Sequence, residues 1–243
     1  LSHISYNMNA KNIVSINHSG FYKLIDQHIK ETKASKSYID GLMMIILSSG
    51  ILKKTEQNEY RFMHQSFQEY FAALELNDTD ARKRIKDQDW HETLIFYSDL
   101  TNSLSPLVNA IYNRFKETKD HQYLFLAARC CIGKNLKEKK AIIGSLLEVY
   151  NYPDMEFYKH WHDLRDIFQL WQDKEVSKAL EEFFLSADDK ISPRLVNVLH
   201  HSDNVLMSSD KRMEILEKVM KKTENKHLLY SIVEVMGFRK NIK

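Results

Sequence analysis

The segment from Tyr60 to Leu76, YRFMHQSFQEYFAALEL, constrains the fold more than any other part of this chain. Its first residues alternate, with Tyr60, Phe62 and His64 in one set and polar or flexible residues between them. A period of two places one set of side chains on one face of a strand. The segment therefore predicts a short strand that ends near His64.

A helix is expected to follow this strand at once. Ser66 and Glu69 have the spacing of a capping box, in which each side chain bonds the backbone N–H of the other residue, so the helix is expected to begin at Phe67. An apolar stripe at i, i+3, i+4 and i+7 then consists of Phe67, Tyr70, Phe71 and Leu74. We expect the helix to pack through this aromatic stripe, with two small alanines, Ala72 and Ala73, admitting a neighbouring element.

His64 is the residue that neither the strand nor the helix requires. A lone histidine at a strand end is usually a structural or surface residue, but the sequence around this one adds information. The stretch FMHQSFQEYFAA resembles the signature that ends the winged-helix domain of NACHT-type STAND signalling NTPases, a family that includes animal NOD-like receptors and bacterial relatives. The matching residues are Phe62, His64, Ser66, Phe67, Gln68, Glu69, Tyr70, Phe71, Ala72 and Ala73.

The resemblance implies a nucleotide-binding role for His64 in a larger parent protein. In this family the winged helix folds over the nucleotide-binding domain, and the histidine of the signature reaches the β-phosphate of ADP. An imidazole N–H can donate to a phosphate oxygen, and the phosphate charge favours the protonated ring. The resemblance also implies ADP or ATP with Mg²⁺ as cofactors of the parent. The remaining signature positions are implied to be structural: Phe62, Ser66, Phe67, Glu69, Tyr70 and Phe71.

The residues before the signature predict the rest of a winged helix. Apolar residues at helical spacing predict helices within residues 1–10, 21–29 and 38–47, and Gly50 can take the left-handed conformation that closes the third. Residues 51–54 and 60–64, joined by a polar turn, read as a β-hairpin. We predict a winged-helix domain over residues 1–76.

Winged helices often bind DNA, which makes DNA binding an alternative function for this chain. A DNA reader needs basic or amide side chains on its third helix to contact phosphates and base edges. The helix YIDGLMMIIL has no Lys or Arg between Tyr38 and Leu47, and nearby lysines are matched by acidic residues. Packing against another protein domain suits this helix better, and DNA binding is the third hypothesis for this chain.

Residues 77–243 are expected to form an α-helical repeat region. Stripes of apolar residues at helical spacing follow one another from Trp90 onward with short linkers, and helix pairs recur about every 30 to 37 residues, as in a degenerate HEAT-like α-solenoid. Only six glycines and three prolines occur in 243 residues, which disfavours a turn-rich β fold. The fold class predicted is mostly α, with one small hairpin.

Several classes of function are disfavoured by what the sequence lacks. No GxxxxGK[ST] motif is present, so the chain is not expected to be an enzyme by itself, and the P-loop part is expected to precede Leu1 in the parent. A net charge of +2 is no nucleic-acid footprint. The basic run from Arg82 to Lys86 reads as a solvated face. The only cysteines, Cys130 and Cys131, are adjacent and cannot form a disulfide framework, which fits a reducing compartment. The sequence also shows no apolar run of membrane-spanning length and no signal peptide, so a cytoplasmic protein is predicted.

No metal site is expected from the histidine pairs. His160 and His162, or His200 and His201, are spaced so that their side chains diverge on a helix. Aromatic residues at helical spacing are read as core, although three of them could instead anchor a partner: Tyr152, Trp161 and Trp171.

Two hypotheses of different class follow. The first is a regulatory and sensing segment of a NACHT-type NTPase in intracellular signalling, with antiviral or innate defence as its setting. Its partners would be the nucleotide-binding domain of the same protein and a trigger at the helical region, and the parent could oligomerise. The second is a stand-alone α-helical scaffold that binds other proteins.

Overall fold

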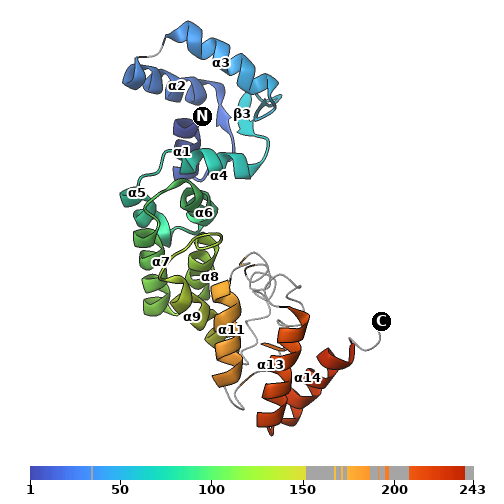
Figure 1. Cartoon of the computed structure of the whole chain (residues 1–243). Coiled ribbons are helices and arrows are strands. Elements are labelled where there is room, and N and C mark those ends of the chain that lie inside the picture. The colour runs from blue at the N-terminus through green and yellow to red at the C-terminus, as the bar shows by residue number, and fades with distance from the viewer. Residues whose placement is uncertain are drawn as a thin grey trace. The chain divides into compact units, whose positions relative to one another are not determined.

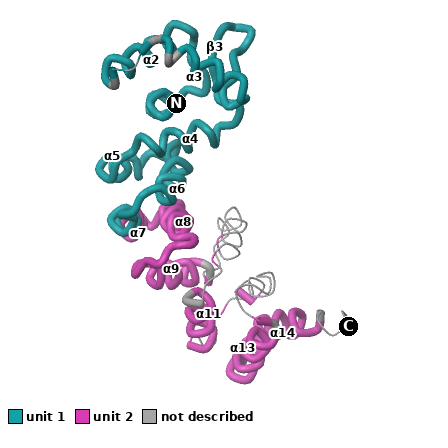
Figure 2. Tube along the Cα trace, turned by 45° about the horizontal axis from the view of Figure 1, so that its top comes forward, with its two compact units in different colours: residues 1–110 teal, residues 111–243 magenta. Residues whose placement is uncertain are grey.

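A computed structural model describes residues 1–33, 35–151, 167, 171, 174–186, 191, 195–196 and 208–238. The chain divides into two compact units, Leu1–Ala110 and Ile111–Lys243 (Figure 2). The described part is mostly helical, with one small antiparallel sheet, which confirms the predicted fold class.

The first unit begins with a winged helix (Figure 1). Its three helices are α1 (Ser2–Ala10), α2 (His18–Thr32) and α3 (Lys36–Ser48). Its strands are β1 (Ile16–Asn17), β2 (Leu52–Lys54) and β3 (Glu59–Phe62), in the antiparallel order β1-β3-β2. The predicted helices and hairpin are present. The third strand, β1, was not predicted, because two residues are too short to show an alternating pattern.

Local sequence explains where these elements begin and end. The Asn17 side chain caps α2 by accepting from the Gly20 N–H at 2.8 Å. Gly50 follows α3 with φ 75°, a left-handed conformation that a residue without Cβ takes at no steric cost, as predicted. In the hairpin turn, Asn58 is left-handed too, with φ 61°. These residues fix the ends of the helices and the register in which Leu52 faces Phe62.

One core joins the helices and the sheet. It contains buried apolar residues from α1, α2, α3, β2 and β3, namely Ile4, Met8, Phe21, Leu24, Ile25, Met43, Leu52, Tyr60 and Phe62. Phe21 stacks on Tyr60, with ring centroids 4.2 Å apart. Burial of large apolar side chains is the main stabilising term in a domain of this kind.

The first unit continues beyond the winged helix. It includes α4 (Gln65–Ala73), α5 (Asp78–Lys83), the 3₁₀ turns η1 (Arg84–Lys86) and η2 (Gln88–Trp90), and α6 (His91–Leu100). Helix α4 lies against both α1 and α6 (Figure 1). Trp90 is fully buried and meets Tyr6 of α1 edge-on, with ring centroids 5.3 Å apart. Residues on both sides of Leu76 therefore pack on α1.

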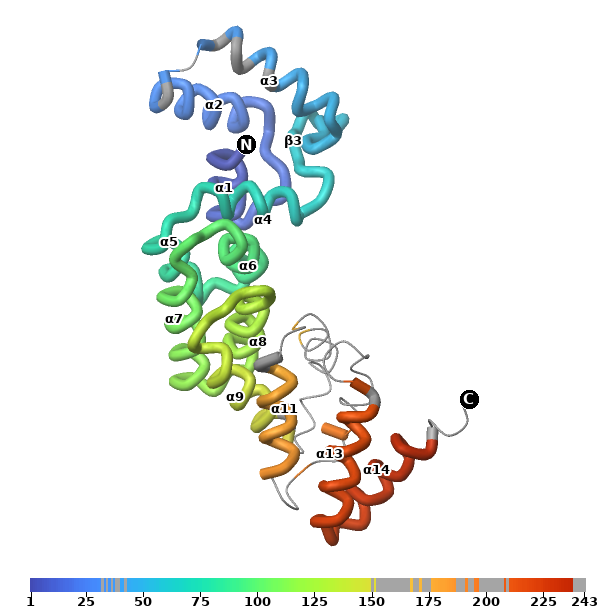
Figure 3. Tube along the Cα trace, viewed as in Figure 1, coloured from blue at the N-terminus to red at the C-terminus, as the bar shows by residue number. Residues whose placement is uncertain are grey.

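The second unit is built from successive helices (Figure 3). Helix α7 (Ser105–Thr118) crosses the boundary between the units, and α8 (His121–Cys130), α9 (Lys139–Asn151), α11 (Lys174–Ser186), α13 (Ser209–Lys222) and α14 (Lys226–Phe238) follow. Contacts join α8 to α9, α9 to α11, α11 to α13 and α13 to α14. This helix-on-helix order agrees with a helical region, while the degenerate HEAT-like α-solenoid stays a prediction.

Buried aromatic and cationic groups meet in the second unit. Trp171 is fully buried, and the Nζ atom of Lys139 lies 5.4 Å from the centroid of its ring. Trp171 is therefore core, and the alternative that it anchors a partner on the surface is wrong. Tyr152 and Trp161, the other two candidates, lie outside the described residues, as do His160, His162, His200 and His201.

Among the described helices, none is long and apolar enough to cross a membrane.

Candidate functional site

The hairpin determines where His64 lies. Tyr60 and Phe62 are buried in β3 while Arg61 between them is exposed, as the alternation predicts. The Met63 N–H donates to the Ile51 carbonyl at 3.0 Å, and β3 ends just before it. His64 then keeps an extended backbone, with φ −130° and ψ 143°, and is the N-cap residue of α4.

The side chain of His64 is exposed. Its ring lies near the ring of Phe67, one turn into α4, with centroids 6.0 Å apart and planes tilted by 55°. No hydrogen bond to its ring nitrogens is found among the residues that the structure describes. Both nitrogens are thus open to a ligand from outside the chain.

The predicted capping box is wrong. Helix α4 begins at Gln65, two residues before the predicted start, and its N-cap residue makes no side-chain capping bond. Ser66 is exposed in the first turn, and Gln65 Nε2 donates to Glu69 Oε1 at 3.0 Å. The helix starts early because the His64 carbonyl already accepts from the Phe67 N–H at 3.1 Å. Ser66 is then inside the helix, where it cannot act as a cap.

The prediction that α4 packs through its aromatic stripe is wrong, while the prediction that Ala72 and Ala73 admit a neighbouring element is confirmed. Phe67, Tyr70 and Leu74 are 37%, 38% and 46% exposed, whereas Ala72 and Ala73 are 0% and 1% exposed. The small alanines let α1 and α6 approach the helix backbone closely, so this side is covered. Phe71 alone of the predicted stripe keeps part of its expected role, since it is half-buried beside the ring of Phe62.

Gln68 holds the buried side of α4. Its Nε2 donates to the Ile13 carbonyl at 3.1 Å and to Asn9 Oδ1 at 3.4 Å, and Asn9 in turn donates to Thr93 Oγ1 at 2.8 Å. These side chains are buried, so each bond also satisfies a polar group that water cannot reach. The sequence pattern by itself predicts no role for Gln68. The available signal was its spacing of four from Ala72, which puts both on one helix face.

An exposed apolar row runs beside His64. It consists of Met63, Phe67, Tyr70 and Leu74, spaced four, three and four residues apart, and Met63 is 47% exposed. The ring of Tyr70 also meets Phe96 of α6 edge-on, with centroids 5.8 Å apart. A hydrogen-bonding ring at the end of an apolar row suits a protein interface that includes one polar ligand.

Helix α3 offers a second apolar surface. Met44, Ile45 and Leu47 are 75%, 63% and 36% exposed. These three exposed side chains carry no positive charge with which to contact phosphates. That α3 faces protein rather than DNA stays a prediction.

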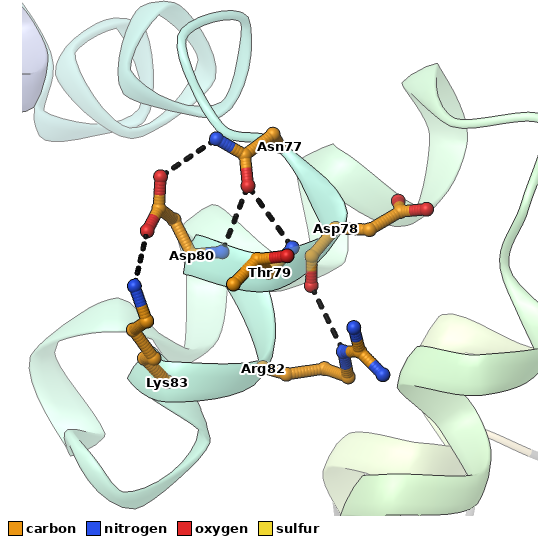
Figure 4. Close-up of polar contacts among 6 residues, drawn as sticks. All are labelled: Asn77, Asp78, Thr79, Asp80, Arg82 and Lys83. Atoms are coloured by element: carbon orange, nitrogen blue, oxygen red, sulfur yellow. Dashed lines mark hydrogen bonds and ion pairs between the residues drawn. The ribbon is translucent and has the colours of Figure 1, made fainter.

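Two residues of the basic run that follows α4, Arg82 and Lys83, bond within their own helix (Figure 4). Lys83 Nζ donates to Asp80 Oδ1 at 3.0 Å, and Arg82 Nε donates to the Asp78 carbonyl at 3.2 Å. Lys83 first and Asn77 second hold the pKa of the Asp80 carboxyl below its usual value, because both donate to the charged form. Arg84 lies over the ring of Trp90, 4.4 Å from its centroid. These contacts favour the solvated face over a nucleic-acid patch.

Comparison with known proteins identifies the first domain. Residues 11–76 match the family model described as a winged helix-turn-helix domain C-terminal to NACHT. The match ends at Leu76, where the signature segment also ends. Comparisons with curated proteins and with solved structures gave no match.

Proposed function

Residues 11–76 are a winged-helix domain of the kind that follows NACHT, and from this we propose that the chain is the regulatory part of a NACHT-type NTPase. In this proposal the winged helix covers the nucleotide-binding domain of the parent protein. His64 donates to the β-phosphate of ADP held there. Exchange of ADP for ATP changes which contacts the winged helix can make, so nucleotide state becomes domain arrangement.

One observation carries the proposal: the signature histidine is exposed at a fixed point, with no partner of its own among the described residues. A histidine that served only the fold of this chain would be expected to bond to it. The neighbouring apolar row of Met63, Phe67, Tyr70 and Leu74 supports a protein surface against this side of α4. Covering that row would also exclude water from the imidazole and strengthen its bond to a phosphate.

The test is ADP release from the parent protein. We expect His64→Ala to speed ADP dissociation about 10- to 100-fold, since a hydrogen bond to a charged group contributes about 1.5–3 kcal/mol. The same substitution in the present chain should leave the midpoint of urea unfolding unchanged, because the side chain is exposed. Dissociation can be followed with a fluorescent ADP analogue by stopped flow.

A matched control is His227→Ala, which removes another exposed histidine, on α14. It should release ADP at the parental rate. Equal ADP off-rates in the His64 variant and the parent would remove the phosphate role. Loss of folding in the His64 variant would show that the residue serves the fold of this chain instead.

A helical scaffold that binds other proteins is the second candidate. Tyr230 and Val233 of α14 lie three residues apart on one helix face and are 72% and 57% exposed. Such residues can anchor a partner. If this candidate alone is correct, Tyr230→Ser will weaken partner binding, and no substitution at His64 will alter nucleotide release.

A further inference from the structure

Three potential metal ligands meet between α1 and α2 of the first unit. They are His3 of α1 and His28 and Glu31 of α2, and one ligand atom from each lies within 4.8 Å of the others. His28 and Glu31 are three residues apart and so share a helix face. The ring of His3 stacks on that of His28, with centroids 5.6 Å apart.

His3 lies beside a second carboxylate. Its Nδ1 lies 3.5 Å from Glu75 Oε1, beyond α4, while its Nε2 is buried with no hydrogen-bond partner among the described residues. A carboxylate beside Nδ1 favours the tautomer that carries its proton there, which leaves a lone pair on Nε2. A buried nitrogen with a free lone pair is unfavourable unless something bonds to it. Carboxylate, histidine and metal in this order are a recurrent arrangement around zinc.

We propose that His3, His28 and Glu31 bind a divalent transition-metal ion, with Zn²⁺ as the best fit and Glu75 as the outer carboxylate. Two imidazoles and one carboxylate are a zinc ligand set that leaves a fourth position for water. Ca²⁺ and Mg²⁺ are poor fits, because they require mainly oxygen ligands.

The geometry needs only side-chain adjustment. Ligand atoms around tetrahedral zinc are about 3.3 Å apart for bonds of about 2.0–2.1 Å. His28 and Glu31 are exposed, so their side chains can rotate to close the remaining distance without disturbing the core. Gln27 Nε2 donates to Glu31 Oε1 at 3.2 Å, which leaves Oε2 to face the ion. A bound ion would tie α1 to α2 and thereby stabilise the winged helix.

The experiment is a titration of the full chain, free of any affinity tag, with Zn²⁺ against a chromophoric chelator at neutral pH. We expect one equivalent to bind tightly. His28→Ala and Glu31→Gln should each weaken that binding at least about tenfold. Glu75→Gln, which removes no ligand, should weaken it about 10- to 100-fold. Zn²⁺ should raise the thermal unfolding midpoint of the unsubstituted chain and have little effect on that of the His28→Ala and Glu31→Gln variants.

The control is His227→Ala, which removes a histidine outside the cluster and should leave zinc affinity unchanged. His28 and Glu31 are exposed, so circular dichroism should find both ligand variants folded. Substitution of Co²⁺ gives an independent readout, a visible absorption band that is lost in His28→Ala. The proposal is overturned if the chain binds no stoichiometric zinc, or if zinc binds equally to the unsubstituted chain and to both ligand variants.

Discussion

The thiols of Cys130 and Cys131 are fully buried in the second unit. Burial raises the pKa of the Cys131 thiol from 9.0 to about 12, because a thiolate is poorly solvated there. The thiolate is the reactive form, so this residue is inert while the chain is folded. The pair therefore belongs to the core and is no candidate for nucleophilic chemistry.

We predict that the folded chain resists alkylation at pH 8 and that both cysteines react in guanidinium chloride. The same burial gives a pH dependence. Between pH 9 and about pH 12 the unfolded chain loses the Cys131 proton and the folded chain keeps it, so stability falls as pH rises, by up to about 1.4 kcal/mol per pH unit. Thiol counting with and without denaturant checks the first part, and urea unfolding across that range checks the second. Rapid labelling of native protein would contradict the assignment.

Residue types reveal chemistry only when their neighbours are near in sequence. The signature identified His64 because its motif is contiguous. The sequence does not show that His3, His28 and Glu31 belong together, since they come close only after α1 and α2 have packed. The role of Gln68 cannot be predicted for a similar reason: its partners, Asn9 and the Ile13 carbonyl, lie far away along the chain.

Among the helices, α4 and α5 begin in different ways. Asn77 caps α5 by accepting from the backbone N–H groups of Thr79 and Asp80, both at 3.0 Å (Figure 4). Ser66, for which a cap was predicted, lies inside α4 instead. An identical kind of substitution should therefore have different effects at the two sites.

We predict that Asn77→Ala lowers the free energy of unfolding by about 1 kcal/mol, the usual value of an N-cap. Ser66→Ala should change it by less than about 0.5 kcal/mol, as expected at an exposed site without a capping bond. Urea denaturation of both variants measures the difference. A larger loss at Ser66 than at Asn77 would restore the predicted capping box.

Helix and strand positions were predicted well for the winged helix, because apolar periodicity and Gly50 act locally. Which face of α4 is buried was not predicted correctly. Its aromatic stripe and its Ala72–Ala73 side are both compatible with burial, and periodicity cannot tell a core face from an interface face. The Ala72–Ala73 side is the buried one because α1 and α6 pack closely against α4, and only small residues leave room for them.

At the scale of the whole molecule, charge limits the choice of partner. The net charge is only +2, and within α5 Lys83 pairs with the Asp80 carboxylate while Arg82 donates to the Asp78 carbonyl. The exposed side chains of α3 include Met44 and Ile45, which are apolar. A winged helix alone does not therefore make this chain a DNA-binding protein.

We predict no saturable binding of a fluorescent 20-bp duplex at low salt, measured by anisotropy. Non-specific DNA binding depends on releasing counterions through many Lys and Arg contacts, whereas the exposed side chains named on α3 are apolar. Binding that tightens steeply as salt is lowered would contradict the prediction and favour the third hypothesis.

The predicted boundary between the domains, after residue 76, stays a prediction, while the compact unit runs to Ala110. The fold class could be predicted because glycine and proline are scarce and helical periodicity is strong. The extent of the first unit could not, because Thr93 and Trp90 join it through packing that no local pattern records.

The bond from Asn9 to Thr93 has a practical consequence for anyone shortening this protein. A polypeptide cut after Leu76 would keep the entire matched domain yet lose α6. The side-chain amide of Asn9 would then lose its bond to Thr93, and the alanines of α4 would become an exposed apolar surface. Such a piece should aggregate on purification, whereas one ending near Ala110 should stay monodisperse. The shortest stable fragment that contains this winged helix is thus expected to extend beyond residue 76, where the family match ends.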